Sequence, residues 1–256
     1  MASPEPIDPY SDPATGVLHN LLHLTERGAL ATAEDDLVGA RLMALPLADL
    51  PATRDLGELC AIHRWLFQDL YGWAGTIRTV DIRKNTPGAE WFLPASMIPR
   101  SAGYAADELR ADHHLQGLGR DAFVERLAHH YDQWNYLHPF REGNGRTQRV
   151  FWSRLARRAG WRLGWAAIDQ AANDHASRLA AEGDLGPLIA LLDQVVSARQ
   201  GRHPDDTADT RLSRDDPAAL AGLTGPAAPV RTAAARQPGL TARGRPSIDG
   251  RGRGRG

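Results

Sequence analysis

The stretch Leu137-His138-Pro139-Phe140-Arg141-Glu142-Gly143-Asn144-Gly145-Arg146-Thr147-Gln148-Arg149 joins two predicted helices and is the most informative part of the sequence. Its proline and glycines predict a short loop in place of a continuous helix. His138 has a side chain whose free pKa lies near neutral pH, so it can take a proton from a hydroxyl group. Glu142 supplies a hard carboxylate oxygen of the kind that binds Mg²⁺.

Gly143, Asn144 and Gly145 follow this carboxylate and give a backbone with little steric bulk. Their N–H groups can converge on an anion where the next helix presents its positively polarised N-terminus. Arg146 and Arg149 lie three residues apart on that helix, so both lie on one face and can donate to phosphates. These residue types, in this order, predict a polyphosphate-binding loop beside a histidine base.

The same window resembles the signature of the Fic family, His-x-Phe-x-(Asp/Glu)-Gly-Asn-Gly-Arg-x-x-Arg, at every specified position. The resemblance implies a protein adenylyltransferase that transfers AMP from ATP, with Mg²⁺, to a Ser, Thr or Tyr hydroxyl of a target protein. It also implies that His138 is the catalytic base and that Glu142 is the metal ligand. The ATP-binding residues expected on this resemblance are Gly143, Asn144, Gly145, Arg146 and Arg149.

Before the motif, the spacing of apolar side chains changes from a helical pattern to a strand pattern. Residues 76–83 alternate apolar and polar side chains, residues 85–88 have turn chemistry, and residues 90–93 read as a second strand. The lead-in resembles that of the Fic flap, a β-hairpin beside the active-site loop whose open edge receives a target segment by strand addition. The expected docking residues are Ile82, Arg83, Lys84 and Phe92, and Lys84 and Asn85 are also expected to touch the nucleotide.

Helical periodicity dominates the rest of the chain, with predicted helices at 55–70, 94–110, 120–137, 146–159, 169–181 and 185–198. The predicted fold class is therefore mainly α, a Fic-type helical bundle with one β-hairpin flap. Residues 17–198 are expected to form the catalytic domain, with a core at about 55–198. Residues 1–16 and the Pro-, Ala-, Gly- and Arg-rich tail 199–256 are expected to be disordered.

Several side chains outside the motif are expected to have structural roles. His63 is expected to be a buried core histidine, and Phe140 a buried anchor for the loop. Neither His113-His114 nor His129-His130 can chelate an ion alone, because adjacent helical residues point about 100° apart. Arg154 is expected on the exposed side of its helix.

The composition excludes several classes of protein. A net charge of −1 gives no overall field for binding nucleic acid, and the single cysteine, Cys60, cannot form an internal disulfide. No apolar run is long enough to span a membrane, and a cytoplasmic location is expected. Nucleic-acid binding is expected, if at all, only weakly through the Arg-Gly end of the tail.

Fic proteins are commonly restrained by an inhibitory helix with the pattern (Ser/Thr)-x-x-x-Glu-(Gly/Asn). Residues 86–91 have the spacing but end in tryptophan, and residues 177–183 are one residue too long. The resemblance to bacterial Fic toxins therefore implies that inhibition comes in trans from a small antitoxin-like partner.

Three alternative functions compete with AMP transfer. One is transfer of the γ-phosphate, as in the Doc-type relatives, which carry a lysine where this chain has Gly145. Another is a catalytically silent nucleotide-binding module that acts through interactions. A metallohydrolase is disfavoured, because His138 and Glu142 have no third His or Asp ligand near them in the sequence.

Overall fold

The computed structural model describes residues 8–84, 90–198 and 230–233. The helices are α1 (Arg27–Met43), α2 (Leu56–Phe67), α3 (Ile98–Ala111), α4 (Arg120–Leu137), α5 (Asn144–Arg158), α6 (Gln170–Ala181) and α7 (Gly186–Asp193). The strands are β1 (Asp81–Lys84), β2 (Trp161–Leu163), β3 (Val196–Ala198) and β4 (Val230–Ala233). The predicted mainly α fold class is confirmed.

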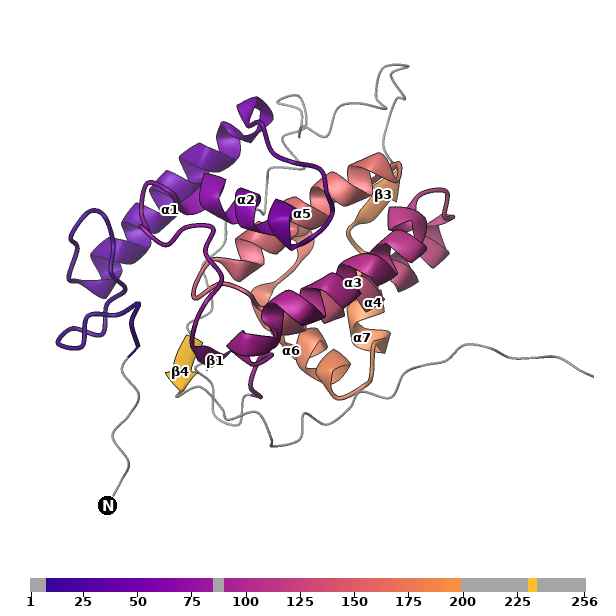
Figure 1. Ribbon diagram of the computed structural model, residues 1–256. Helices are drawn as coiled ribbons and strands as arrows, with labels where there is room; N and C mark the ends of the chain where they lie inside the picture. Colours follow the sequence, from indigo (N-terminus) through magenta and orange to yellow (C-terminus); the bar gives the residue numbers. More distant parts are fainter. Residues whose placement is uncertain (1–7, 85–89, 199–229, 234–256) are drawn as a thin grey trace, which may run out of the picture.

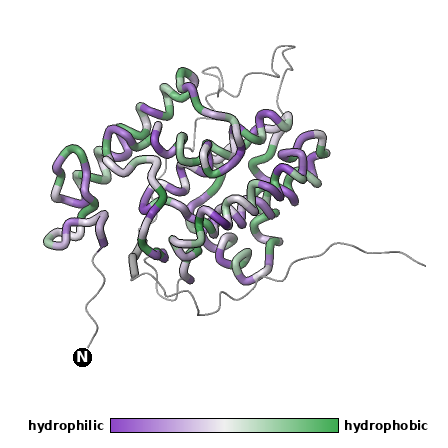
Figure 2. Tube along the Cα trace, in the orientation of Figure 1, coloured by the Kyte–Doolittle hydropathy of each residue, from purple (hydrophilic) through white to green (hydrophobic). Residues whose placement is uncertain are grey.

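The bundle is built around α4, which packs against α3, α5, α6 and α7. Helix α5 also packs on α2, and α1 lies along α2 (Figure 1). Hydrophobic and hydrophilic residues alternate along the helices (Figure 2), because each helix turns one apolar face inward. The largest buried apolar side chains are Trp134, Trp152, Trp165, Phe67, Phe123, Phe140 and Phe151.

Helix boundaries follow local chemistry where the sequence shows it. Asp55 caps α2, since its side chain accepts the N–H of Glu58 at 3.1 Å. Helix α4 has the predicted bounds, and α5 begins two residues earlier than predicted, directly after Gly143. The predicted helix 185–198 was too long, because α7 ends at Asp193 and residues 196–198 pair with β2 as a strand.

Residues 8–16 contact the folded chain, although residues 1–16 were expected to be disordered. Asp8 accepts hydrogen bonds from Arg141 at 2.8 and 3.0 Å. The Tyr10 ring meets Trp73 edge-on, with ring centroids 5.4 Å apart. Composition could not reveal these contacts, because each depends on one specific partner. Residues 1–7, 199–229 and 234–256 lie outside the described residues, and the disorder expected there stays a prediction.

The flap is shorter than the expected hairpin. Strand β1 covers only Asp81–Lys84, and an isolated bridge joins Arg83 to Trp91 on the returning segment. Residues 85–89, which include the predicted turn, lie outside the described residues. On its other side β1 pairs with β4, a segment of the tail that was expected to stay outside the fold (Figure 1).

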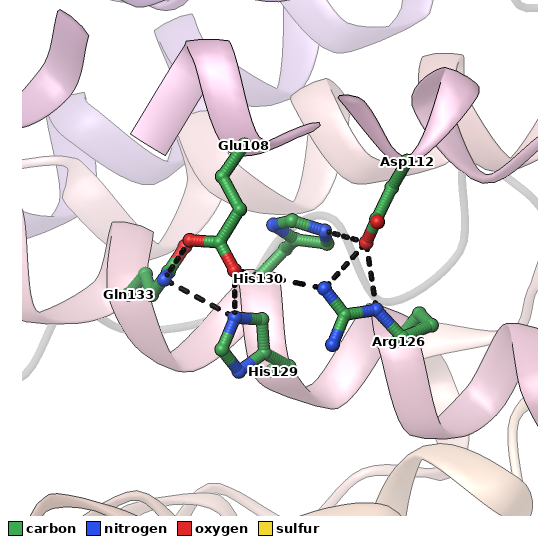
Figure 3. Close-up of polar contacts among 6 residues, drawn as sticks. All are labelled: Glu108, Asp112, Arg126, His129, His130 and Gln133. Carbon is green, nitrogen blue, oxygen red and sulfur yellow. Dashed lines mark hydrogen bonds and ion pairs between the residues drawn. The ribbon is translucent and has the colours of Figure 1, made fainter. Parts of the chain in front are cut away.

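A polar cluster, here called the α3–α4 clamp, joins the two helices in Figure 3. His129 Nε2 lies 2.6 Å from Glu108 Oε1, and His130 Nε2 lies 2.8 Å from Asp112 Oδ2. Arg126 also donates to Asp112, at 2.6 Å. The two histidines contact different carboxylates, and no cluster suited to a metal ion occurs in the described part of the chain. The expectation that neither histidine pair chelates an ion alone stays a prediction.

Arg154 is 3% exposed, so its predicted place on a solvated face was wrong. Its Nε donates to Glu58 Oε1 at 2.8 Å, and its guanidinium also donates to Pro51 O at 2.8 Å. The periodicity of α5 alone could not show this, because the partners come from α2 and from the segment that leads into it. Among the described residues, no helix has both the length and the apolar character that a membrane crossing requires.

Candidate functional site

His138 ends α4 in a left-handed backbone conformation, with φ 41° and ψ 61°. Its Nδ1 lies 3.2 Å from Asn135 O, and Phe92 stacks on its ring with centroids 3.6 Å apart. Its carbonyl oxygen accepts a hydrogen bond from Arg78 Nε at 2.8 Å. A non-glycine residue in this region costs about 1–3 kcal/mol, and the surrounding contacts hold it there.

The hydrogen bond at Nδ1 decides which ring nitrogen of neutral His138 carries the proton. The Asn135 carbonyl can only accept, so Nδ1 carries the proton and Nε2 carries the lone pair. Burial first, and the Arg78 charge second, lower the pKa of His138 to about 3. The imidazole is therefore neutral at pH 7, with a nitrogen able to accept a proton, which is the state a general base requires.

The carboxylate of Glu142 lies at the turn into α5. Its Oε1 accepts the N–H of Gly143 at 2.7 Å and lies 3.8 Å from an Arg146 nitrogen. Burial, and then the nearby carboxylate of Glu34, raise the pKa of Glu142 to about 7. A cation bound beside this poorly solvated group would restore its ionised form.

The two motif glycines differ in their surroundings. Gly143 has φ +80°, and a Cβ there would lie 2.4 Å from Phe67 Cζ. Gly145 is exposed in the first turn of α5, and a Cβ there would meet nothing within 4 Å. The fold thus requires glycine at 143, whereas at 145 a missing side chain leaves open space above the helix end.

Asn144 uses its side chain to close the loop. Its Oδ1 accepts the N–H of Phe140 at 2.9 Å, and its Nδ2 donates to Phe140 O at 2.8 Å. Thr147 Oγ1 donates to Gly143 O at 2.8 Å and fixes the next turn. Because a helix leaves its first N–H groups without helical partners, the amides of Asn144 and Gly145 at the start of α5 are of the kind that can bind an anion.

Arg146 lies beneath the loop and is 4% exposed. Its guanidinium pairs with Glu34 of α1 and sits 5.0 Å from the centroid of the Phe67 ring. Tyr71 donates its hydroxyl to the same Glu34 carboxylate. The structure therefore gives the Arg146 side chain protein partners, and its positive charge lies under the turn that begins α5.

The remaining predicted site residues lie outside the loop between α4 and α5. Arg149 is half-buried on α5, and its charge acts on the buried Tyr131 hydroxyl. Lys84 pairs with Asp174 of α6, while Asn85 lies outside the described residues. The predicted docking residues occur together on the flap: Ile82 is fully buried, Arg83 stacks over Trp91 at 4.9 Å, and Phe92 covers His138.

Two residues that no motif singled out hold the loop in place. His63 Nε2 donates to Glu142 O at 3.0 Å, because its Nδ1 accepts from Gly75 N at 2.7 Å. Arg78 is 2% exposed and donates to the carbonyls of His138, Val80 and Leu93, so it ties the flap to the end of α4. His63 was expected in the core, which is confirmed, but no spacing in the sequence connects it with Glu142.

Comparison with known proteins identifies the family. The profile described as Fic/DOC family matches residues 54–156. A relative from Salmonella typhimurium, named probable protein adenylyltransferase Fic, is 38% identical over 190 residues, which cover 74% of this chain and 92% of the relative. This chain belongs to the Fic family. The Fic domain here is also 36% identical over 185 residues to protein adenylyltransferase VbhT of Bartonella schoenbuchensis, covering 72% of this chain and 38% of that protein.

Solved structures agree on the fold. The BepC protein of Bartonella tribocorum, crystallised with bound AMPPNP, superposes with a TM-score of 0.70 at 22% identity. The match covers 75% of this chain and 97% of that chain. The helical bundle around the motif is therefore the Fic fold.

Proposed function

We propose that this Fic domain transfers AMP from ATP to a Ser, Thr or Tyr hydroxyl of a target protein. The observation that carries the proposal is the state of His138, a neutral imidazole with an unprotonated Nε2 at the end of α4, where the chain enters the loop that leads to α5. The relatives named protein adenylyltransferase support the same chemistry. The open space at Gly145 suits close approach of a phosphate to the helix N-terminus.

In the proposed reaction, His138 Nε2 takes the proton of the target hydroxyl as its oxygen bonds to the α-phosphorus. The bond between the α-phosphorus and the bridging oxygen to the β-phosphorus breaks, and pyrophosphate leaves. The α5 amides at Asn144 and Gly145 orient phosphate oxygens, and Arg149 stabilises charge on the leaving group. The side chains of Asn144 and Arg146 act mainly by holding the loop that presents these amides.

Glu142 is the residue we propose to hold Mg²⁺. Its contacts among the described residues use Oε1, and a second carboxylate oxygen remains for a cation. One carboxylate fits the way Mg²⁺ binds with nucleotides, through one or two protein oxygens together with phosphates and water. Bound there, Mg²⁺ would neutralise phosphate charge.

The flap is proposed to dock the target segment as an added strand. Phe92 of the returning segment touches the His138 ring directly, and Ile82 is fully buried at the flap root. An added strand would therefore extend a flap whose returning segment contacts the proposed base. Backbone hydrogen bonds would then give affinity without demanding a particular target sequence.

We also propose that a small antitoxin-like partner restrains the protein as a toxin in trans. The support is the sequence, in which no segment completes the pattern (Ser/Thr)-x-x-x-Glu-(Gly/Asn). Purified protein that modifies neither itself nor added proteins in the presence of ATP and Mg²⁺ would contradict a missing inhibitor.

Labelled ATP tests the central proposal. The purified full chain is incubated with bacterial lysate, Mg²⁺ and ATP labelled at either the α- or the γ-phosphate. Label transferred to protein from the α position alone supports AMP transfer. Transfer from the γ position alone supports the Doc-type alternative, and no transfer from either position supports a silent nucleotide-binding module.

A further inference from the structure

The two edges of β1 have different neighbours. On the inner edge, Phe92 N donates to Ile82 O at 3.1 Å and Arg83 bridges to Trp91. On the outer edge, all four residues of β1 pair antiparallel with β4. The far side of the returning segment is also in use, since Leu93 N donates to Tyr136 O at 3.1 Å. In the described flap, the outer edge of β1 is thus where an added strand pairs, and a segment of the same chain pairs with it.

The register shows which backbone groups make this pairing. Successive residues of a strand point their N–H and C=O groups to opposite edges. Because Ile82 O points to the inner edge, the groups of Arg83 point to the outer edge. Arg231 lies opposite Arg83, so these two residues form a hydrogen-bonded pair, while Thr232, opposite Ile82, turns its N–H away from β1.

The sequence of the tail segment suits a strand. Val230 and Thr232 are β-branched, and Pro229 immediately precedes them in the sequence, a position where proline is tolerated before a strand. Residues 199–229 separate β3 from β4 along the chain. A segment tethered to its own docking edge acts at an effective concentration on the order of mM, above the concentration of most separate protein targets.

We propose that Val230–Ala233 occupies the target-docking edge of the flap in cis, so that a target segment must displace it before it can reach the active site. This inference rests on the proposed function for its consequence, but the occupation of the edge is a property of the chain alone. The proposed docking surface is the outer edge of β1, and its ligand is an extended segment that binds by main-chain hydrogen bonds.

Site-resolved amide hydrogen exchange of the full chain tests the occupation without any nucleotide. Arg231→Pro removes an N–H that faces β1, whereas Thr232→Pro introduces the same ring at a position whose N–H faces outward. Arg231→Ala controls for the lost guanidinium. We expect the Arg83 amide to exchange about tenfold faster in Arg231→Pro than in the wild type. It should stay protected in Thr232→Pro and in Arg231→Ala, and the Lys84 amide, which faces the inner edge, should not change.

A peptide probe tests the same surface by competition. A fluorescein-labelled peptide of residues 227–236 is titrated into each full-length variant. We expect it to bind Arg231→Pro about tenfold more tightly than wild type or Thr232→Pro, because only that variant leaves the edge open. A peptide carrying the Arg231→Pro change should not bind.

The results separate the two proposals. Equal Arg83 exchange in all variants, or failure of the peptide to bind Arg231→Pro, would overturn the occupied edge. A wild-type enzyme that transfers α-label while its Arg83 amide is unprotected would refute only the strand. Absence of label transfer by Arg231→Pro, in which the edge is open, would refute only the adenylyltransferase.

Discussion

The same substitution at two positions of the motif loop should have opposite effects on stability. In Gly143→Ala the new methyl group would lie 2.4 Å from Phe67 Cζ, at a residue with φ +80°. Overpacking costs about 1–3 kcal/mol and the left-handed conformation about 1–2 kcal/mol more. The free energy of unfolding should therefore fall by roughly 2–5 kcal/mol, which lowers Tm by roughly 5–15 °C in a domain of this size.

Gly145→Ala should instead stabilise the fold. A Cβ there meets no atom within 4 Å, and alanine is favoured over glycine in a helix by about 0.5–1 kcal/mol. The same methyl group would project into the space proposed for the phosphates. We expect affinity for a non-hydrolysable ATP analogue to fall about tenfold, which corresponds to ~1.4 kcal/mol.

Calorimetry measures both effects. Differential scanning calorimetry without nucleotide gives Tm, and isothermal titration with the analogue and Mg²⁺ gives Kd. Phe67→Ala provides a matched test of the clash, because it removes the ring that the Gly143→Ala methyl would strike, so the double variant should lose less stability than the two single variants add up to. Unchanged nucleotide affinity in Gly145→Ala would refute phosphate binding beside Gly145. An unchanged Tm in Gly143→Ala would refute the predicted clash with Phe67.

Three further predictions concern the base, the flap anchor and the clamp. His138→Ala should keep its affinity for the ATP analogue and lose α-label transfer by about 10²–10⁴-fold, and retained transfer would exclude His138 as the base. Arg78→Lys should lower Tm and slow transfer, because an ammonium group cannot reach three backbone carbonyls at once; the exposed Arg110→Lys, measured alongside, should change neither. Burial opposes ionisation of Asp112, but the hydrogen bonds from His130 and Arg126 outweigh burial and lower the pKa of this carboxyl group. The ionised Asp112 therefore stabilises the fold fully above the unfolded pKa of about 3.9, and this stabilisation disappears as pH falls through the lower folded pKa. In urea unfolding between pH 6 and pH 2, Asp112→Asn should accordingly weaken the acid dependence of stability, and a wild-type slope would contradict the clamp.

The parts of the fold that sequence reasoning could reach depend on neighbours in the chain. The Asp55 cap and the bounds of α4 come from contacts between residues at most four positions apart, so residue types alone predict them. The motif loop is local in the same way, since Asn144 hydrogen-bonds the backbone of Phe140. Local order of this kind leaves a pattern in the sequence.

The missed parts depend on partners far away in the chain. Arg154 was expected in solvent because the pattern of its own helix identifies it only as a polar position. Its partner Glu58 lies at the start of α2, far away in the sequence. Glu34 gives no sign in the sequence that its carboxylate meets Arg146. The tail strand was missed for the same reason, because a four-residue strand without a neighbouring partner has no period to detect.

These distant partners bear on how much a motif match can establish. The motif supplies the groups proposed to touch the substrates, but separate segments hold them: the N-terminal stretch through Arg141, α2 through His63, and the flap lead-in through Arg78. A left-handed His138 and a buried Glu142 are strained or poorly solvated states that the motif could not maintain alone. AMP transfer should therefore depend on residues outside the signature. A substitution at one of those residues that lowers activity should also disorder the loop, even when every motif residue is intact.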